Sequence, residues 1–173
     1  MFQVIKSRLE ESKDQSKKPE RIDLLQTLLN LYSVDKKEAE KSGIFSQVFG
    51  FMLAGHETTS LTMTWTIYLL SKYPEIQDKV RKEISSVLKS QTEIRWEDID
   101  KLKYLDNCIR ESLRMYPPGP FVGREPVKEE KFGPYTIPAN TTLFVNFASL
   151  QRDPEFWTDP NVFNPDRFQS IGK

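Results

Sequence analysis

The sequence predicts a mainly α-helical fold with a small β portion, which is an α+β class. Three observations support this prediction. Apolar residues recur at helical spacing in several segments before Pro117. Nine of the eleven prolines lie from Pro117 onward, so the helical part is expected to end there. β-branched and aromatic residues then collect after Pro120, which favours short strands.

Residues 42–71 predict one long helix. Glu57 is the only charged side chain in this window, which predicts either a buried helix or a membrane span. Six small or polar residues, 55–60, interrupt the apolar runs on either side. A glycine costs a helix interior about 0.5–1 kcal/mol and a buried carboxylate costs more, so the interruption predicts a functional site. The alternative is an exposed polar turn or a helix–helix contact. A His-Glu-x-x-His metal site is excluded, because Ser60 stands where the second histidine is needed.

Four further helical segments are predicted from the spacing of apolar residues and from prolines that begin or end a helix. Pro74 suits the first turn of an amphipathic helix over 74–88. A second helix is predicted over 104–116, where two prolines end it. Residues 96–103 predict a short helical turn, and residues 23–32 a weak helix.

The helix over 104–116 carries an acid, a base and the only cysteine. Glu111 and Arg114 are three residues apart and share a helix face, a spacing that by itself is typical of a solvated surface pair. Cys108 is predicted to be a small buried hydrophobe.

The β portion is predicted to be one small hairpin. Tyr135–Ile137 and Thr141–Phe147 have strand composition and flank the turn residues Pro138–Asn140. Residues 153–168, which hold three prolines and several aromatic residues, predict a loop.

Composition excludes several classes of protein. The chain has 173 residues, about one domain, and its 25 Lys and Arg balance 25 Asp and Glu. A net charge of zero without a basic stretch argues against nucleic-acid binding. One cysteine excludes an intrachain disulfide, and Cys108 and His56 alone cannot form a structural zinc site, which needs about four ligands. Residues 1–20 are charged and predict no signal or anchor.

Four segments occur in a suggestive order. They are Ala54-Gly55-His56-Glu57-Thr58, then Glu111-Ser112-Leu113-Arg114 with Met115-Tyr116-Pro117-Pro118, then Leu150-Gln151-Arg152-Asp153-Pro154, and finally Phe163-Asn164-Pro165-Asp166-Arg167-Phe168. In this order they resemble the cytochrome P450 family of haem-thiolate monooxygenases, over about residues 23–168. The first segment resembles the family's oxygen-binding signature, the second its Glu-x-x-Arg helix, and the last its aromatic-Pro-x-Arg-Phe segment. Gln151 stands where the family often has histidine.

The resemblance implies a partial cytochrome P450 fold and a role for each motif. In the family the long central helix crosses the distal face of the haem, so Ala54 and Gly55 would leave room for dioxygen on the iron. Thr58 would hydrogen-bond the iron-bound peroxo group, and Glu57 would relay protons to it. Arg124 stands where family members carry an arginine that pairs with a haem propionate.

The resemblance also implies a buried structural network. Glu111, Arg114 and Arg167 would form a Glu-Arg-Arg lock rather than a catalytic group. Breaking such a network costs about 3–5 kcal/mol.

By the same resemblance, residues 1–173 are expected to be a single piece of a catalytic domain, from the central helix through the aromatic-Pro-x-Arg-Phe segment. The N-terminal part and the loop whose cysteine ligates the haem iron are expected to lie outside this sequence. Cys108 cannot replace that ligand, because it belongs to the Glu-x-x-Arg helix. We therefore expect no metal ligand in the chain, no stable haem binding and no activity of the chain alone.

The parent protein is expected to insert one oxygen atom of O2 into a lipophilic substrate, which would be a fatty acid, a sterol or a xenobiotic. Electrons would come from NADPH through a flavoprotein reductase. The sequences of these motifs most resemble those of microsomal eukaryotic fatty-acid and sterol hydroxylases. This implies the endoplasmic reticulum membrane, reached through an N-terminal anchor that the chain lacks.

Two alternatives remain. A membrane protein could span a bilayer with residues 42–71, although the polar centre and the short apolar halves count against it. A non-catalytic protein could retain only the middle of the fold as an interaction module. A Phe-x-x-Gly-x-Arg-x-Cys-x-Gly stretch in the reading frame soon after Lys173 would favour the truncated enzyme over the module.

Overall fold

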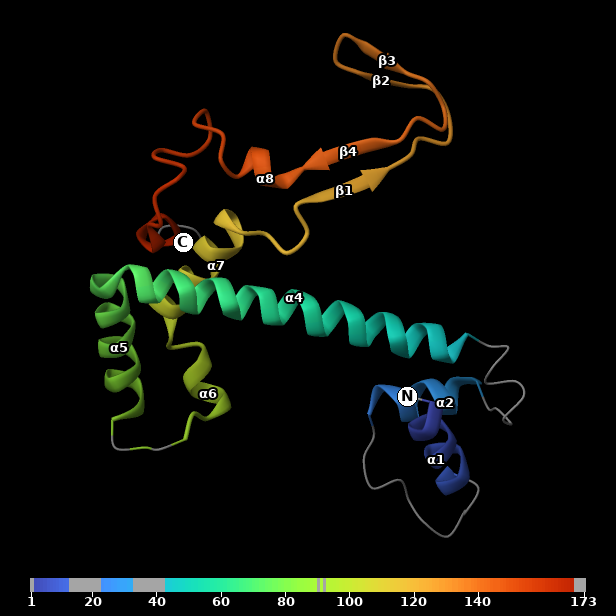
Figure 1. Cartoon of the computed structure of the whole chain (residues 1–173), viewed down its shortest axis with the longest axis horizontal. Helices are drawn as coiled ribbons and strands as arrows, with labels where there is room; N and C mark the ends of the chain where they lie inside the picture. The colour runs from blue at the N-terminus through green and yellow to red at the C-terminus, as the bar shows by residue number, and fades with distance from the viewer. Residues whose placement is uncertain (1, 13–22, 33–42, 90, 92, 170–173) are drawn as a thin grey trace. The chain divides into compact units, whose positions relative to one another are not determined.

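The computed structural model describes residues 2–12, 23–32, 43–89, 91 and 93–169. The chain divides into two compact units, Met1–His56 and Glu57–Lys173 (Figure 1). Helices dominate, and the strands form two short antiparallel ladders. The predicted α+β class is confirmed.

In the first unit, the structure describes residues 2–12, 23–32 and 43–56, all but two of which lie in helices. These are α1 (Phe2–Ser12), α2 (Leu24–Tyr32) and the first part of α4 (Ile44–Lys72). Ile5, Leu29 and Ile44 form its buried apolar cluster. Asp23 caps α2, because its Oδ1 accepts the N–H of Gln26 at 2.8 Å. The helix predicted over 23–32 is confirmed as α2, whereas the sequence prediction omits α1.

The long helix predicted over 42–71 is confirmed as α4. The prediction that it is buried is wrong for its middle, where every residue from 49 to 61 is exposed. Burial is confined to the ends, at Ile44 in the first unit and at Thr66 and Leu69 in the second. Apolar composition predicts a surface that favours burial, but it does not specify which segment covers that surface. Among the helices that the structure describes, none has the length and apolar character needed to cross a membrane.

The second unit begins with the end of α4, which is followed by the helices that precede the strands. They are α5 (Pro74–Leu88), α6 (Trp96–Ile99) and α7 (Lys103–Met115), which confirm the predicted helices over 74–88 and 104–116 and the short turn between them. The buried cluster of this unit contains Leu69, Ile76, Val80, Cys108, Met115 and Phe163. Cys108 is fully buried, as predicted. The end of α7 is fixed on α4 by the stacked rings of Trp65 and Tyr116, whose centroids are 4.0 Å apart.

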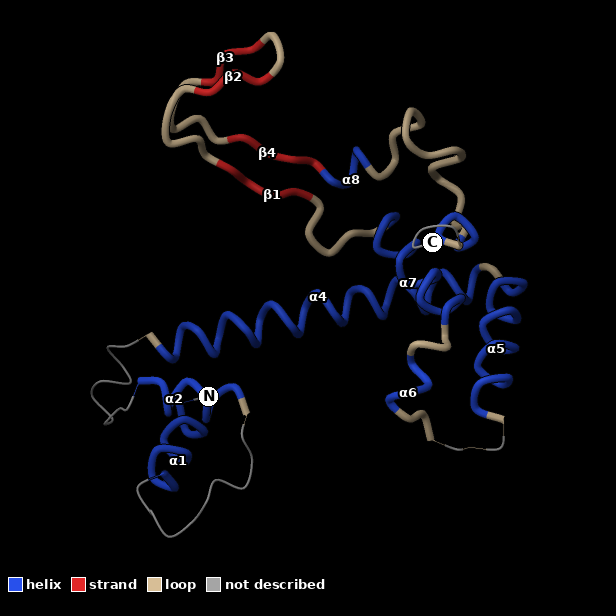
Figure 2. Tube along the Cα trace, turned by 180° about the vertical axis from the view of Figure 1, so that it is seen from behind, coloured by secondary structure: helices blue, strands red, loops and turns tan. Residues whose placement is uncertain are grey.

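The single hairpin predicted within residues 135–147 is wrong in its pairing. β3 (Tyr135–Ile137) pairs with β2 (Glu130–Phe132), and β4 (Leu143–Asn146) pairs with β1 (Phe121–Arg124). Figure 2 shows the two ladders in red, one continuing outward from the other.

The position of the tight turn explains this difference. Gly133 lies between β2 and β3 with φ at 59°, a left-handed conformation that glycine adopts at little cost. The residues Pro138–Asn140 instead connect the two ladders. Both stretches have turn composition, so local sequence does not decide which of them joins paired strands.

Short capped turns follow the ladders. α8 (Phe147–Leu150) begins directly after β4, where the Asn146 side chain accepts the N–H of Ser149 at 3.1 Å. The strand predicted over 141–147 therefore ends at Asn146. The loop predicted over 153–168 is confirmed except for a short 3-10 helix, η1 (Pro165–Phe168), which packs against α7.

Candidate functional site

Glu111 and Arg114 form a fully buried ion pair on α7. Arg114 Nε donates to Glu111 Oε2 at 2.7 Å, and Arg114 Nη2 donates to Glu111 Oε1 at 2.9 Å. The exposed fractions of the two side chains are 2% and 0%. The i, i+3 spacing brings the groups together, and the two parallel bonds make the pairing bidentate.

Arg167 joins this pair from η1. Its Nε donates to Glu111 Oε1 at 3.1 Å, and the backbone N–H of Asn164 donates to the same oxygen at 3.0 Å. The Nη atoms of Arg167 bind backbone carbonyls, namely those of Thr158, Asp159 at 2.7 Å and Val162 at 3.3 Å. The structure thus brings Glu111, Arg114 and Arg167 together, and we call them the Glu-Arg-Arg network.

Two arginines make further contacts that connect α7 to the segment after α8. Arg114 Nη1 donates to the carbonyl of Gln151 at 2.6 Å, and its guanidinium lies 5.0 Å from the centroid of the Trp157 ring. Arg152 Nη2 donates to the carbonyl of Met115, the last residue of α7, at 2.6 Å. Sequence reasoning did not assign a role to Arg152 or to the Asn164 amide. The signal for Arg152 was its place in the Gln151–Pro154 motif, whereas a backbone amide leaves no signal in sequence.

The network satisfies charges that would otherwise be costly to bury. Glu111 accepts four hydrogen bonds, two from Arg114, one from Arg167 and one from Asn164. A buried charge is tolerated only when it is paired and hydrogen-bonded. Because Arg167 and the Asn164 amide reach Glu111 from η1 and the residue before it, the arrangement fixes η1 on α7.

The polar interruption of α4 is exposed. Ala54, Gly55, Glu57 and Thr58 all lie in the exposed stretch of the helix. A Cβ added at Gly55 would meet no atom within 4 Å, so the backbone there is open to a close neighbour. The carbonyl of Thr58 accepts the hydroxyl of Thr62 at 2.7 Å. The stretch can therefore present a carboxylate and a hydroxyl to a molecule on this face.

A pocket of about 570 Å³ lies beside Thr58 in the second unit. Its lining is mostly apolar and comes from α4, α7 and the chain after α7, namely Thr58, Thr59, Thr62, Met63, Ile109, Leu113, Pro118 and Gly119. Of the residues predicted to form the site, only Thr58 lines it. The pocket and the Glu-Arg-Arg network use different faces of α7, since Leu113 lines the pocket whereas Arg114 is buried.

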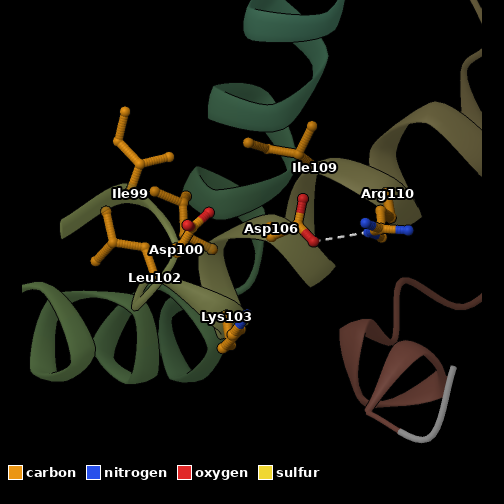
Figure 3. Close-up of a pocket in the computed structure, with 8 residues that line it drawn as sticks. Ile99, Asp100, Leu102, Lys103, Asp106, Ile109 and Arg110 are labelled. Carbon is orange, nitrogen blue, oxygen red and sulfur yellow. Dashed lines mark hydrogen bonds and ion pairs between the residues drawn. The ribbon is translucent and has the colours of Figure 1, made fainter. Parts of the chain in front are cut away.

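A second pocket, of about 360 Å³, lies where α6 meets α7 (Figure 3). Ile99, Leu102 and Ile109 provide apolar walls, and Asp106 and Arg110 form an exposed ion pair of 2.7 Å at its edge. None of the residues predicted to form the site lies here.

Arg124 is exposed at the end of β1. Its Nη1 donates to the carbonyl of Gly123 at 2.8 Å. Among the described residues, no hydrogen bond or ion pair joins Arg124 to the Glu-Arg-Arg network or to Thr58. Its guanidinium is therefore available to an anionic partner.

Cys108, unlike the exposed Arg124, is fully buried. Burial, with the nearby carboxylates of Glu83 and Asp166, raises the pKa of its thiol from 9.0 to about 12. The thiol is therefore protonated at neutral pH, and it points into the apolar cluster of the second unit.

Comparison with known proteins places this geometry in a family. The family described as Cytochrome P450 matches residues 1–172 of the chain. Human cytochrome P450 4Z1 is 39% identical over 170 residues, which are 95% of this chain and 34% of the human protein. Mouse cytochrome P450 3A41 is 33% identical and is matched over 99% of this chain and 35% of its own length. The chain thus spans about a third of the length of the curated relatives it matches.

A solved structure agrees with these sequence matches. A zebrafish cytochrome P450 determined with progesterone superposes with a TM-score of 0.66 at 30% identity, covering 70% of this chain and 29% of the zebrafish chain. The family match over nearly the whole sequence and this structural likeness lead to one conclusion: the chain belongs to the cytochrome P450 family.

Proposed function

We propose that this chain forms part of a haem-dependent monooxygenase that inserts one oxygen atom of O2 into a lipophilic substrate. The observation that carries the proposal is the Glu-Arg-Arg network, in which Glu111 is completely buried between two arginines. Such an arrangement is costly unless it is complete, and here every partner is present. Family membership supports the monooxygenase chemistry in general.

The exposed stretch of α4 would serve oxygen chemistry. Haem, when bound, supplies the centre at which O2 is activated. Ala54 and Gly55 would leave space beside the helix, since a Cβ at Gly55 meets nothing within 4 Å. Glu57 is exposed, so its carboxylate can exchange protons with water, and the Thr58 hydroxyl can donate a proton onward. We assign proton delivery to these two residues.

Arg124 would hold a carboxylate of the cofactor. Its guanidinium is exposed on β1, and a guanidinium is suited to bidentate pairing with a propionate. The Glu-Arg-Arg network would act at a distance from this chemistry, by keeping α7 and η1 together.

The residues of the chain do not supply one further group that the haem would need, a cysteine thiolate to hold its iron. Cys108 is the only cysteine of the chain, and that thiol is buried with its pKa raised to about 12. A thiolate ligand would therefore have to come from a segment other than these 173 residues. We infer that the chain alone neither binds haem as a thiolate complex nor oxidises a substrate.

The substrate class, the electron supply and the location are also proposals, and one relative supports the first of them. The zebrafish protein was determined with progesterone, a steroid. We propose a lipophilic substrate of the fatty-acid or sterol class and electron supply from NADPH through a flavoprotein reductase. We propose the endoplasmic reticulum membrane as the location of the complete protein.

The test is a carbon-monoxide difference spectrum of reduced protein. Two polypeptides are compared, the 173-residue chain and the product of the same reading frame expressed at the length of its relatives. A thiolate-type Soret band in the longer polypeptide alone is the expected result. No such band in either would overturn the monooxygenase proposal in favour of a non-catalytic module. A band in the 173-residue chain would overturn the inference about Cys108.

A further inference from the structure

One acidic residue of α5 lies on the face that should be apolar. Ile76, Val80, Ile84 and Val87 form the apolar stripe of α5, and Glu83 falls in that stripe, seven residues after Ile76. Its side chain is half-buried. A carboxylate in such a position is costly unless it has hydrogen-bond partners.

The partners of Glu83 are two backbone amides of another helix. Glu83 Oε1 accepts the N–H of Tyr104 at 2.7 Å, and Glu83 Oε2 accepts the N–H of Leu105 at 3.0 Å. Within the described part of the chain, no cation lies within ion-pair distance of Glu83. Both carboxylate oxygens of Glu83 are thus hydrogen-bonded to α7.

These two amides are the ones that α7 leaves unsatisfied. α7 begins at Lys103, so Tyr104 and Leu105 are its second and third residues, whose N–H groups have no partner inside the helix. A side chain at the preceding position usually accepts such an N–H, but that position is Leu102, which makes no cap hydrogen bond. The negative charge also lies at the end of the helix where the macrodipole favours an anion.

We propose that Glu83 is the N-terminal cap of α7, supplied from α5, and that it acts as a positioning residue for the Glu-Arg-Arg network. Glu111 follows Tyr104 by about two helical turns. Fixing the first turn of α7 against α5 therefore fixes where Glu111 meets Arg167 and the Asn164 amide. This role goes beyond the proposed oxygen chemistry and needs neither haem nor substrate.

The test is residue-resolved amide hydrogen exchange by NMR on the whole 173-residue chain. In Glu83→Ala, the amides of Tyr104 and Leu105 should exchange faster relative to the amides of Ile109 and Leu113. The expected factor is between about twofold and thirtyfold, which corresponds to the loss of helix stability that follows removal of an N-terminal cap. Glu83→Gln should show a smaller increase, since its amide group retains one acceptor oxygen.

Two control variants separate capping from other effects. Glu129→Gln makes the same charge change at an exposed residue that has no hydrogen bond or ion pair among the described residues, and it should leave the exchange of both amides unchanged. Val80→Ala loosens the interface of α5 and α7 without removing a cap. It should accelerate exchange along α7 generally, without singling out the first turn.

Labelling of Cys108 by a thiol reagent completes the design. Cys108 is buried one turn after the capped amides, so its labelling rate under native conditions measures the opening of α7. If Glu83→Ala unfolds the chain, Glu83→Gln tests the proposal instead. The measurement is again the exchange of Tyr104 and Leu105 relative to that of Ile109 and Leu113. Exchange of Tyr104 and Leu105 that rises only in proportion to the rest of α7, as in Val80→Ala, would overturn the proposal. Such a failure would leave the proposed oxygen chemistry untouched, because the spectral test addresses that separately.

Discussion

Arg114→Ala is expected to remove a large part of the free energy of unfolding of the second unit. Arg114 gives Glu111 two hydrogen bonds and gives the carbonyl of Gln151 a third, at 2.6 Å. The substitution leaves the fully buried Glu111 carboxylate with Arg167 and the Asn164 amide alone. Breaking a buried pair by removing one partner costs about 3–5 kcal/mol, against total stabilities of about 5–15 kcal/mol.

Urea titration followed by tryptophan fluorescence measures this loss. The three tryptophans, Trp65, Trp96 and Trp157, all lie in the second unit, so their fluorescence reports on it. The matched control is Arg110→Ala on the same helix, which removes an ion pair with Asp106 that is about half exposed. Such a pair is worth about 0–1 kcal/mol, so the control should remain close to the parent chain.

Comparing Arg114→Ala with Arg110→Ala tests whether the buried network stabilises the second unit. If Arg114→Ala lowered the free energy of unfolding by no more than Arg110→Ala does, burial of the Glu-Arg-Arg network would contribute nothing to stability. The structural role assigned to Glu111, Arg114 and Arg167 would then be wrong.

Three further predictions concern Thr58, Cys108 and Arg124. In the full-length protein, supplied with the NADPH-dependent reductase proposed above, Thr58→Ala should raise the NADPH consumed per product formed, because the hydroxyl that we propose delivers protons is gone. Unchanged coupling would contradict this proton role. Because burial raises the pKa of Cys108 from 9.0 to about 12, the unfolded chain loses this proton first, and the free energy of unfolding should fall as pH rises from about 9 towards 12. Urea titrations on either side of pH 9 should show a shallower fall in Cys108→Ala, and equal slopes would refute the linkage. Arg124→Leu should change the free energy of unfolding by less than about 0.5 kcal/mol, because Arg124 is exposed, yet lower the haem retained by the full-length protein during gel filtration. Equal retention would argue against a propionate contact.

Helices were predictable because their signal is local. The spacing of apolar residues predicted a helix over 104–116, and α7 runs from Lys103 to Met115. Pro74 likewise marked the start of α5. In a helix each backbone hydrogen bond joins residues four apart, so a short stretch of sequence contains the information that forms it.

Strand pairing was not predictable in the same way. The residues of β3 and β4 were identified as strands, but each pairs with a partner upstream, in β2 and β1. Two neighbouring turn signals, at Gly133 and at Pro138–Asn140, left the register open. The choice depends on contacts between segments that are distant in sequence, which local composition does not encode.

For the candidate site, the sequence by itself determined which residues share an element. It placed Glu111 and Arg114 on one face of a helix, and it placed Glu57 and Thr58 side by side in the polar interruption of α4. By spacing alone, Glu111 and Arg114 were a surface pair, and only the resemblance to a family joined Arg167 to them.

The tertiary structure decided burial and partners. Arg167 reaches Glu111 across 56 residues of sequence, and Glu83 caps α7 from another helix. The long apolar helix α4, in contrast, is exposed through its middle. The backbone geometry of one element fixes the direction of its side chains, whereas the environment of a charge depends on which distant segment packs against it.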